Sequence, residues 1–401
     1  MNLLTHCRAM ACSCRYFWPL NFSLATEILS VTTMFPLKTL STFSSSCIAW
    51  QFTSHMISPL FYHKNISLRQ KRCHAPDGGA LSRNHAGKRP GAALLTKGEQ
   101  PMYNFLETFD LERDSMKYEN LRFPGGLQKA VTFSYDDGCR HDVRLSETVS
   151  SYGIKCTFNI SSAFIKETEG EWYLSEKQIR ENILDKGYEI AVHGHRHRAP
   201  GVQRPIEGIK DVLECRLELE KRFGVIVRGM AYPDTGITVI SGGQSYDEIR
   251  RYLTDLDIVY ARSLGGDNDK FLLPGDWLNW IPTAHHTNPD LFRYIDKFNA
   301  VDESGYDSKQ SPALFYLWGH SFEFDRSGNW ELLDKICKKL SGRSDVWYAT
   351  NMEIYDYVTA YRSLVHSADG SVVYNPTLKD IWFKIDKGET RHIAPGETLK
   401  L

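Results

Sequence analysis

The fold is decided by the stretch Thr132-Phe133-Ser134-Tyr135-Asp136-Asp137-Gly138. Its apolar residues alternate with small or polar ones, which is the pattern of a β-strand with two different faces, and Gly138 then permits a turn. Two adjacent carboxylates are an unusual way to end a strand unless a cation lies beside them. An ordinary Asp-Gly turn is the alternative interpretation of this segment taken alone.

Strand and helix patterns alternate from Lys129 onward, which is typical of βα units around a parallel sheet. We expect strands at residues 130–135, 154–160, 188–192, 225–231, 258–262, 314–318 and 346–349. We expect helices at residues 145–152, 175–184, 209–223, 246–256 and 330–340. About seven such units predict an α/β fold in the form of a distorted, incomplete (β/α) barrel.

The two ends of the chain differ from this central part. Residues 1–101 lack helical or strand periodicity and are rich in Ser and Thr, so we expect a disordered or targeting-like extension. A start site assigned too far upstream gives the same composition, and we favour it over a targeting leader, with Met102 as the natural first residue. Residues 102–362 are the expected barrel domain. Residues 363–401 contain short apolar runs between turn residues, and they predict a small appendage of antiparallel β-strands.

Composition excludes several classes of protein. A chain of 401 residues with 42% hydrophobic residues can bury a large core. Residues 101–401 carry 37 Lys and Arg against 46 Asp and Glu, which disfavours a nucleic-acid partner. No apolar run reaches the roughly 18 residues that a membrane-spanning helix needs.

The nine cysteines are an odd number without a Cys-x-x-Cys pair, which disfavours a disulfide framework or a thiolate zinc site. Free thiols favour a reducing, cytoplasmic location, with an extracellular location as the alternative. The sequence leaves the oligomeric state open.

Polar residues follow four of the expected strands at the same end, where the active sites of (β/α) barrels are built. Asp136 and Asp137 follow the first strand, the segment His193-Gly194-His195-Arg196-His197 follows the third, Tyr232 follows the fourth and His320 follows the sixth. Two histidines four residues apart, together with one carboxylate, can bind a divalent cation and leave a coordination position open for water. The alternative for the histidine segment is a solvated basic turn.

The stretch 132–138 together with His193-x-x-x-His197 resembles the polysaccharide deacetylase family, carbohydrate esterase family four, over about residues 129–361. The resemblance implies a metal-dependent hydrolase that removes N-acetyl or O-acetyl groups from a carbohydrate. By motif position, Asp136 becomes the catalytic base, and Asp137, His193 and His197 become the metal ligands, with Zn²⁺ as the expected cation. His195 then lies beside the ligands or faces solvent.

Two later motifs match the family less closely. Arg228-Gly229-Met230-Ala231-Tyr232-Pro233 resembles a segment of the substrate groove, but Ala231 stands where the family usually has an arginine that tunes the base. Leu317-Trp318-Gly319-His320 resembles the family's Leu-x-His ending and implies that His320 is the general acid. We expect Trp318 to contact substrate and the backbone N–H of Tyr232 to hold the oxyanion.

Two other functions fit these residues. The same site can act on a small non-sugar amide or cyclic imide instead of an acetylated carbohydrate. A catalytically silent carbohydrate-binding protein is the second alternative, and the missing arginine at position 231 suggests it.

Overall fold

The computed structural model describes residues 118–401 apart from residues 265–267, 303–309 and 387. The predictions for residues 1–101 therefore lie outside the described part of the chain. Within that part, no helix combines the length and the apolar character needed to cross a membrane. Its four cysteines are all buried and unpaired, as expected of free thiols.

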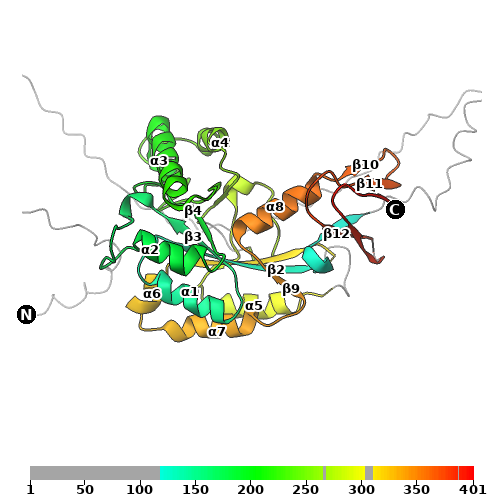
Figure 1. Ribbon diagram of the computed structural model, residues 1–401, viewed down its shortest axis with the longest axis horizontal. Coiled ribbons are helices and arrows are strands. Elements are labelled where there is room, and N and C mark those ends of the chain that lie inside the picture. Colours follow the sequence, from blue (N-terminus) through cyan, green and yellow to red (C-terminus); the bar gives the residue numbers. More distant parts are fainter. Residues whose placement is uncertain (1–117, 265–267, 303–309, 387) are drawn as a thin grey trace, which may run out of the picture. The chain divides into compact units, whose positions relative to one another are not determined.

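The centre of the described chain is one parallel sheet of eight strands (Figure 1). Its strands are β2 (Lys129–Asp136), β3 (Cys156–Ile160), β4 (Glu189–Val192), β5 (Gly229–Ala231), β6 (Tyr260–Arg262), β7 (Ala284–His285), β8 (Ala313–Gly319) and β9 (Val346–Tyr348). They run in the order β6-β5-β4-β3-β2-β8-β7, and β9 pairs with the first residues of β2. The expected incomplete (β/α) barrel is confirmed, and the two-residue strand β7 is an addition to the seven strands expected.

Helices follow most of these strands. They are α1 (Asp142–Ser151), α2 (Glu176–Ile179), α3 (Pro205–Phe223), α4 (Tyr246–Asp255), α5 (Leu291–Asn299), α6 (Ser321–Arg326), α7 (Trp330–Leu340) and α8 (Asn351–Arg362), and a π-helical turn (Arg180–Leu184) extends α2. Ser175 caps α2 with the expected capping box, and Gly224 ends α3 in the left-handed region at φ 68°. The helices α5, α6 and α8 were not expected from the sequence.

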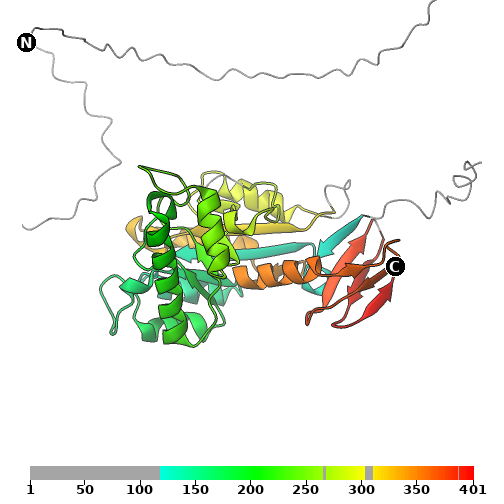
Figure 2. The ribbon, with the colours of Figure 1, turned by 90° about the horizontal axis from the view of Figure 1, so that it is seen from above.

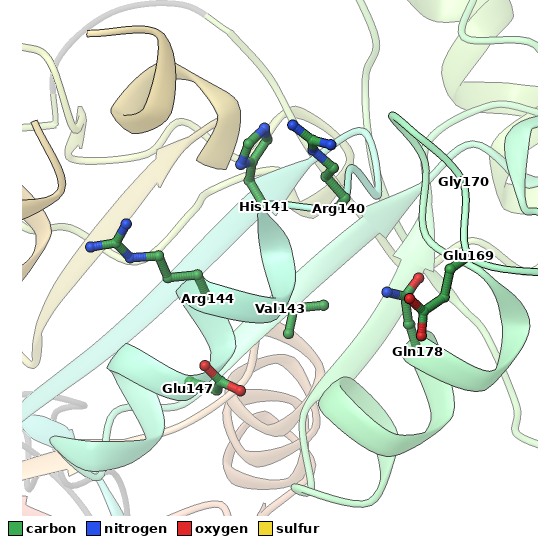
Figure 3. A pocket seen from close by; sticks show the side chains of 8 residues that line it. All are labelled: Arg140, His141, Val143, Arg144, Glu147, Glu169, Gly170 and Gln178. Atoms are coloured by element: carbon green, nitrogen blue, oxygen red, sulfur yellow. The ribbon is translucent and has the colours of Figure 1, made fainter. Parts of the chain in front are cut away.

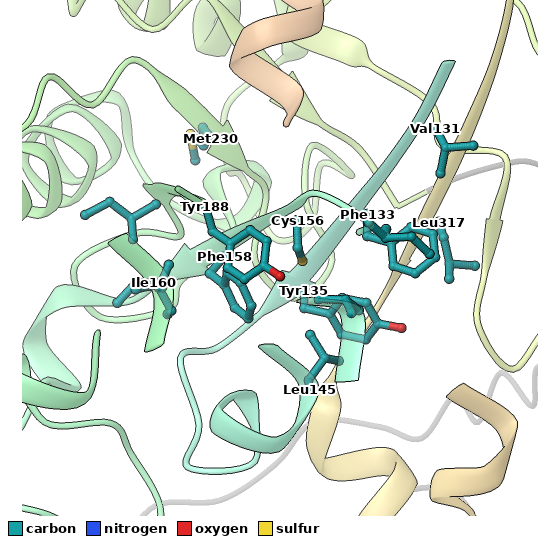
Figure 4. Packing of buried hydrophobic residues seen from close by; sticks show 14 of the residues in the cluster. Val131, Phe133, Tyr135, Leu145, Cys156, Phe158, Ile160, Tyr188, Met230 and Leu317 are labelled. Atoms are coloured by element: carbon teal, nitrogen blue, oxygen red, sulfur yellow. The ribbon is translucent and has the colours of Figure 1, made fainter. Parts of the chain in front are cut away.

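The alternation in β2 gives the sheet two different faces. Val131, Phe133 and Tyr135 point outward into the large core beneath the surrounding helices (Figure 4). The residues between them point to the inner face, where Thr132 and Ser134 are buried and polar. Asp136 continues this inner row and is 1% exposed. The period of the strand therefore directs Asp136 into the barrel.

Helix α8 fills the inside of the incomplete barrel. The side chain of Asn351, at its first turn, accepts a hydrogen bond from Thr132 Oγ1 at 2.9 Å and donates one to the hydroxyl of Tyr316 at 2.6 Å. The inner core also contains Ile354, Tyr357 and Val358 from α8 and Tyr260, Trp280 and Leu314 from the barrel. Burial of this apolar surface by α8 replaces the contacts that further strands would make in a closed barrel.

The last part of the chain forms the expected antiparallel strands, at the far end of α8 (Figures 1 and 2). One small sheet joins β1 (Glu119–Arg122), β12 (Ile381–Ile385) and β13 (Thr390–Ile393), and the other joins β10 (Val365–His366), β11 (Val372–Tyr374) and β14 (Thr398–Lys400). Strand β1 precedes β2 along the chain, so these sheets adjoin the Lys129 end of β2. Asp136 lies at its opposite end.

Candidate functional site

Asp137, His193 and His197 converge beyond the ends of β2 and β4, and their ligand atoms lie within 4.8 Å of one another. Asp137 Oδ1 is 3.4 Å from His193 Nε2 and 3.1 Å from His197 Nε2. Two ligand atoms that each lie about 2.1 Å from a tetrahedrally coordinated ion are about 3.4 Å apart. The three side chains are thus spaced as ligands of one cation.

The tautomer of His193 is set by its other ring nitrogen. Nδ1 lies 2.9 Å from the carbonyl oxygen of Ala231, which can only accept, so Nδ1 carries the proton and Nε2 presents its lone pair. His193 is 1% exposed, and its Nε2 and Asp137 Oδ1 are both buried without a hydrogen-bond partner. A cation between these two buried acceptors would satisfy both of them. The residues therefore fit a divalent metal.

Two of the three clustered residues have backbone conformations that residues other than glycine seldom adopt. Asp137 has φ 81° and His197 has φ 55°, both in the left-handed region. Such strain persists only where the surrounding structure imposes it, and it is common at functional sites. At Asp137 the turn breaks the alternation of β2, so adjacent carboxylates project in different directions.

The histidine segment is held from behind by Asp211 of α3. The backbone N–H of Arg196 donates to Asp211 Oδ1 at 3.0 Å, and that of His195 donates to the Asp211 carbonyl at 3.1 Å. The His195 ring pairs with Ser162 Oγ at 2.9 Å and takes no part in the three-residue cluster. A Cβ on Gly194, which has φ 71°, would lie 2.5 Å from Asp211 Oδ2. A side chain at position 194 would therefore strain the backbone and displace the Asp211 carboxylate.

We expect Gly194→Ala to weaken metal binding by about 10- to 100-fold, the range found when groups that orient metal ligands are lost. The added methyl group must displace Asp211, and the histidine segment then moves. Gly224→Ala is the matched control, because Gly224 has φ 68° but open space around its Cβ position. Both variants lose about 1–2 kcal/mol of stability from the left-handed backbone. Equal metal affinity in the two variants, measured by titration, would contradict this role for Gly194.

Asp136 lies beside the cluster of Asp137, His193 and His197 and is fixed by two neighbours. Asn159 Nδ2 donates to its Oδ1 at 2.8 Å, and Arg262 Nη2 donates to its Oδ2. Burial raises the pKa of Asp136, but Arg262, His193 and His320 outweigh burial, so that this pKa lies below its usual value. Asp136 is therefore an ionised carboxylate in a buried position, which suits a general base.

Arg262 places a guanidinium beside Asp136, although the sequence has alanine at position 231. Ala231 in β5 and Arg262 in β6 are direct partners in the parallel ladder, so the guanidinium comes from the neighbouring strand. Arg262 is fully buried, and its guanidinium carbon lies 4.1 Å from the centroid of the Trp318 ring. Ala231 puts in doubt any tuning of Asp136 by an arginine of that segment, and a guanidinium from a different strand contacts Asp136 instead. The sequence did offer one signal for Arg262, because this arginine is the last residue of the strand expected at 258–262.

His320 follows β8 and faces the base. Its Nε2 is 3.9 Å from Asp136 Oδ2, and its Nδ1 is 3.5 Å from Glu323 Oε2. Burial lowers the pKa of His320, but Glu323, Asp136 and Asp137 outweigh burial and raise this pKa above its ordinary value. This direction favours the protonated, imidazolium form of His320. Sequence reasoning missed Glu323, although it lies three residues after His320, one turn along α6.

Tyr232 does not have the role expected from the sequence. Its backbone N–H donates to the carbonyl of Arg262 at 3.0 Å, within the sheet. Its side chain is fully buried, and the hydroxyl donates to the carbonyl of Leu278 at 2.7 Å. This N–H is already used, so Tyr232 is not the oxyanion donor. Trp318, expected to contact substrate, is half-buried and covers Arg262.

A separate hollow runs along α1 (Figure 3). Its lining residues are Arg140, His141, Val143, Arg144, Glu147, Glu169, Gly170 and Gln178. They include neither a residue of the three-ligand cluster nor Asp136 or His320. The hollow is therefore not the centre of the chemistry described above.

Comparison with protein families gives a match to the polysaccharide deacetylase family over residues 125–252. The resemblance to the polysaccharide deacetylase family is confirmed. The matched residues include Asp136, Asp137, His193 and His197. They end before Arg262 and His320, so the geometry alone associates those two residues with the polysaccharide deacetylase motifs.

Several solved structures of this family are similar to the chain. A putative polysaccharide deacetylase from Mycobacterium smegmatis shares 15% identity, covers 62% of this chain and 96% of its own, and has a TM-score of 0.43. A family 4 acetyl xylan esterase from Clostridium thermocellum, in complex with a cobalt ion, shares 17% identity over 57% of this chain and 91% of its own, with a TM-score of 0.36. The chitin deacetylase of Colletotrichum lindemuthianum shares 14% identity over 57% of this chain and 88% of its own, with a TM-score of 0.37. No curated protein sequence matched.

Proposed function

We propose that this protein is a metal-dependent deacetylase that removes N-acetyl or O-acetyl groups from a carbohydrate. One observation carries the proposal: an ionised, buried Asp136 lies beside the ligand set of Asp137, His193 and His197 and 3.9 Å from the imidazole of His320. A base, a cation site and a proton donor are thereby brought to one rim of the barrel. Metal-assisted hydrolysis of an acyl group uses these three components.

The ligand set suits Zn²⁺, because two imidazoles and one carboxylate are a common protein ligand set for catalytic zinc and leave a position open. When bound, the cation would polarise the acetyl carbonyl and lower the pKa of a water molecule. The backbone carbonyl of Ala231 keeps His193 in the tautomer that this binding needs.

Asp136 and His320 then divide the proton transfers. Asp136 accepts a proton from the attacking water, while Arg262 and Asn159 keep its carboxylate ionised and oriented. His320 donates a proton to the nitrogen or oxygen that leaves the acetyl carbon. The water oxygen is added to that carbon as the bond to the sugar breaks, so the products are acetate and a free amine or hydroxyl group.

Aromatic residues at the rim favour a carbohydrate over a small amide. Trp172 is 42% exposed, and its ring lies 5.6 Å from that of Phe322. The ring of Phe322 is in turn 5.2 Å from His320. An exposed indole separated from His320 by the ring of Phe322 offers a flat apolar surface for the face of a sugar unit away from the reacting acetyl group.

The proposal is tested with acetylated chito-oligosaccharides, acetylated xylan, small acetamides and a cyclic imide, each supplied to zinc-loaded protein. We expect acetate release from a carbohydrate and at most slow turnover of the small substrates. Turnover of the small amides or the imide alone would contradict the carbohydrate assignment. Sugar binding without acetate release, at any divalent metal supplied, would indicate a silent binding protein. Asp136→Asn protein, prepared in the same way, controls for contaminating esterases.

A further inference from the structure

A second group of histidines surrounds the carboxylate of Glu323, next to the site described above. Glu323 Oε2 lies 3.1 Å from His285 Nε2, 3.1 Å from His286 Nε2 and 3.5 Å from His320 Nδ1. His285 ends β7, His320 follows β8 and Glu323 belongs to α6. Strand β7 pairs in parallel with β8, which is why residues 35 positions apart in sequence meet here.

Hydrogen bonding does not account for this arrangement. A carboxylate oxygen has two lone pairs, so it cannot accept well-directed bonds from three imidazoles. His320 Nδ1 is buried without a hydrogen-bond partner, and Glu323 Oε2 already accepts a bond from the backbone N–H of His320 at 3.3 Å. An unpaired buried nitrogen beside a carboxylate is costly unless another group satisfies it.

A divalent cation has the chemistry to do so. One nitrogen each from His285 and His320, with one oxygen of Glu323, lie within 4.8 Å of one another. Two imidazoles and a carboxylate are the same donor types as in the first cluster, and they suit Zn²⁺ or another borderline cation. We propose that His285, His320 and Glu323 bind a second divalent cation, distinct from the one assigned to Asp137, His193 and His197.

The second cation would inhibit the enzyme, a consequence that rests on the proposed role of His320. An imidazole whose Nδ1 coordinates a metal cannot also become the imidazolium ion. His320 would then lose its function as proton donor to the leaving group, although its Nε2 still faces Asp136. Activity should therefore rise as the first site fills with zinc and fall as the second site fills.

The decisive measurement is the number of cations bound at saturation, by equilibrium dialysis against Zn²⁺ and by titration of Co²⁺ absorption. We expect two cations per chain in the natural protein, one in His285→Gln, one in His197→Gln and none in the double variant. His392→Gln is the matched control, because His392 also pairs with a carboxylate, that of Asp380 at 2.8 Å, but on the remote β appendage. It should keep both cations.

Saturation of the natural protein at one cation, unchanged in His285→Gln, would overturn the proposal. Circular dichroism establishes that each variant is folded, and Glu323→Gln provides a second variant of the same site. The activity assay separates the two proposals. Failure of the deacetylase function would leave two cations bound but no acetate released, whereas failure of the second site would leave acetate release intact with one cation. Loss of zinc inhibition in His285→Gln would support the second site.

Discussion

Asp137→Asn is expected to lose the catalytic cation, whereas Asp136→Asn is expected to keep it and lose turnover. Asp137 Oδ1 faces both ligand histidines, at 3.4 and 3.1 Å, and an amide oxygen is a much weaker ligand than a carboxylate. We expect metal affinity at this site to fall by at least about 100-fold, above the effect of losing an orienting group. Metal content and acetate release are measured on the same preparations.

Asp136 instead accepts hydrogen bonds from Asn159 and Arg262, so its loss leaves the three metal ligands in place. Loss of a general base typically costs about 10² to 10⁴ in rate. The two substitutions remove the same charge from adjacent residues, and each is therefore the control for the other. Equal loss of the metal in both variants would refute the division of roles between the two carboxylates.

Arg262→Gln is expected to move the acid limb of the kcat/KM profile to higher pH and to lower the maximal rate. Arg262 holds the pKa of Asp136 below its usual value, against the opposite effect of burial. Without the guanidinium that pKa rises. The base must be ionised to accept a proton, so activity is then lost at a higher pH as the solution is acidified.

Removing one partner of a buried ion pair also destabilises the fold, typically by about 3–5 kcal/mol, so stability must be measured beside activity. Arg262→Lys keeps the charge and should restore part of the acid limb, although lysine lacks the forked geometry. Arg228→Gln is the matched control, because Arg228 pairs with Asp257 at 2.7 Å on the protein surface. This substitution should leave the pH dependence of kcat/KM unchanged. An acid limb that stays in place in Arg262→Gln would contradict this role.

Features set by neighbouring residues could be predicted from the sequence. The alternation in residues 130–135 predicts a strand, and it correctly directs Asp136 to the face opposite Tyr135. Ser175 and Gly224 mark helix ends through their own side-chain and backbone preferences. The four-residue spacing of His193 and His197 likewise lies within one short segment, which the structure places beside Asp137.

Features that join distant segments were missed or placed wrongly. Helix α8 was not expected, because its burial depends on the open barrel that it fills. The N–H of Tyr232 was expected to be free, but the pairing of β5 with β6 uses it. Glu323 gave no signal by itself, since two of its histidine neighbours, His285 and His286, come from a distant part of the chain.

The stretch from Thr132 to Gly138 determined by itself that a strand would end in two carboxylates, because strand period and turn chemistry depend only on adjacent residues. Only the tertiary structure decided what those carboxylates meet. Asp136 and Arg262 are 126 residues apart, and the register of β5 with β6 brings the guanidinium to a position where the local motif has alanine. A charge acts through space on its neighbours, so any strand that ends at the same rim of the barrel as β2 can supply the positive charge beside Asp136.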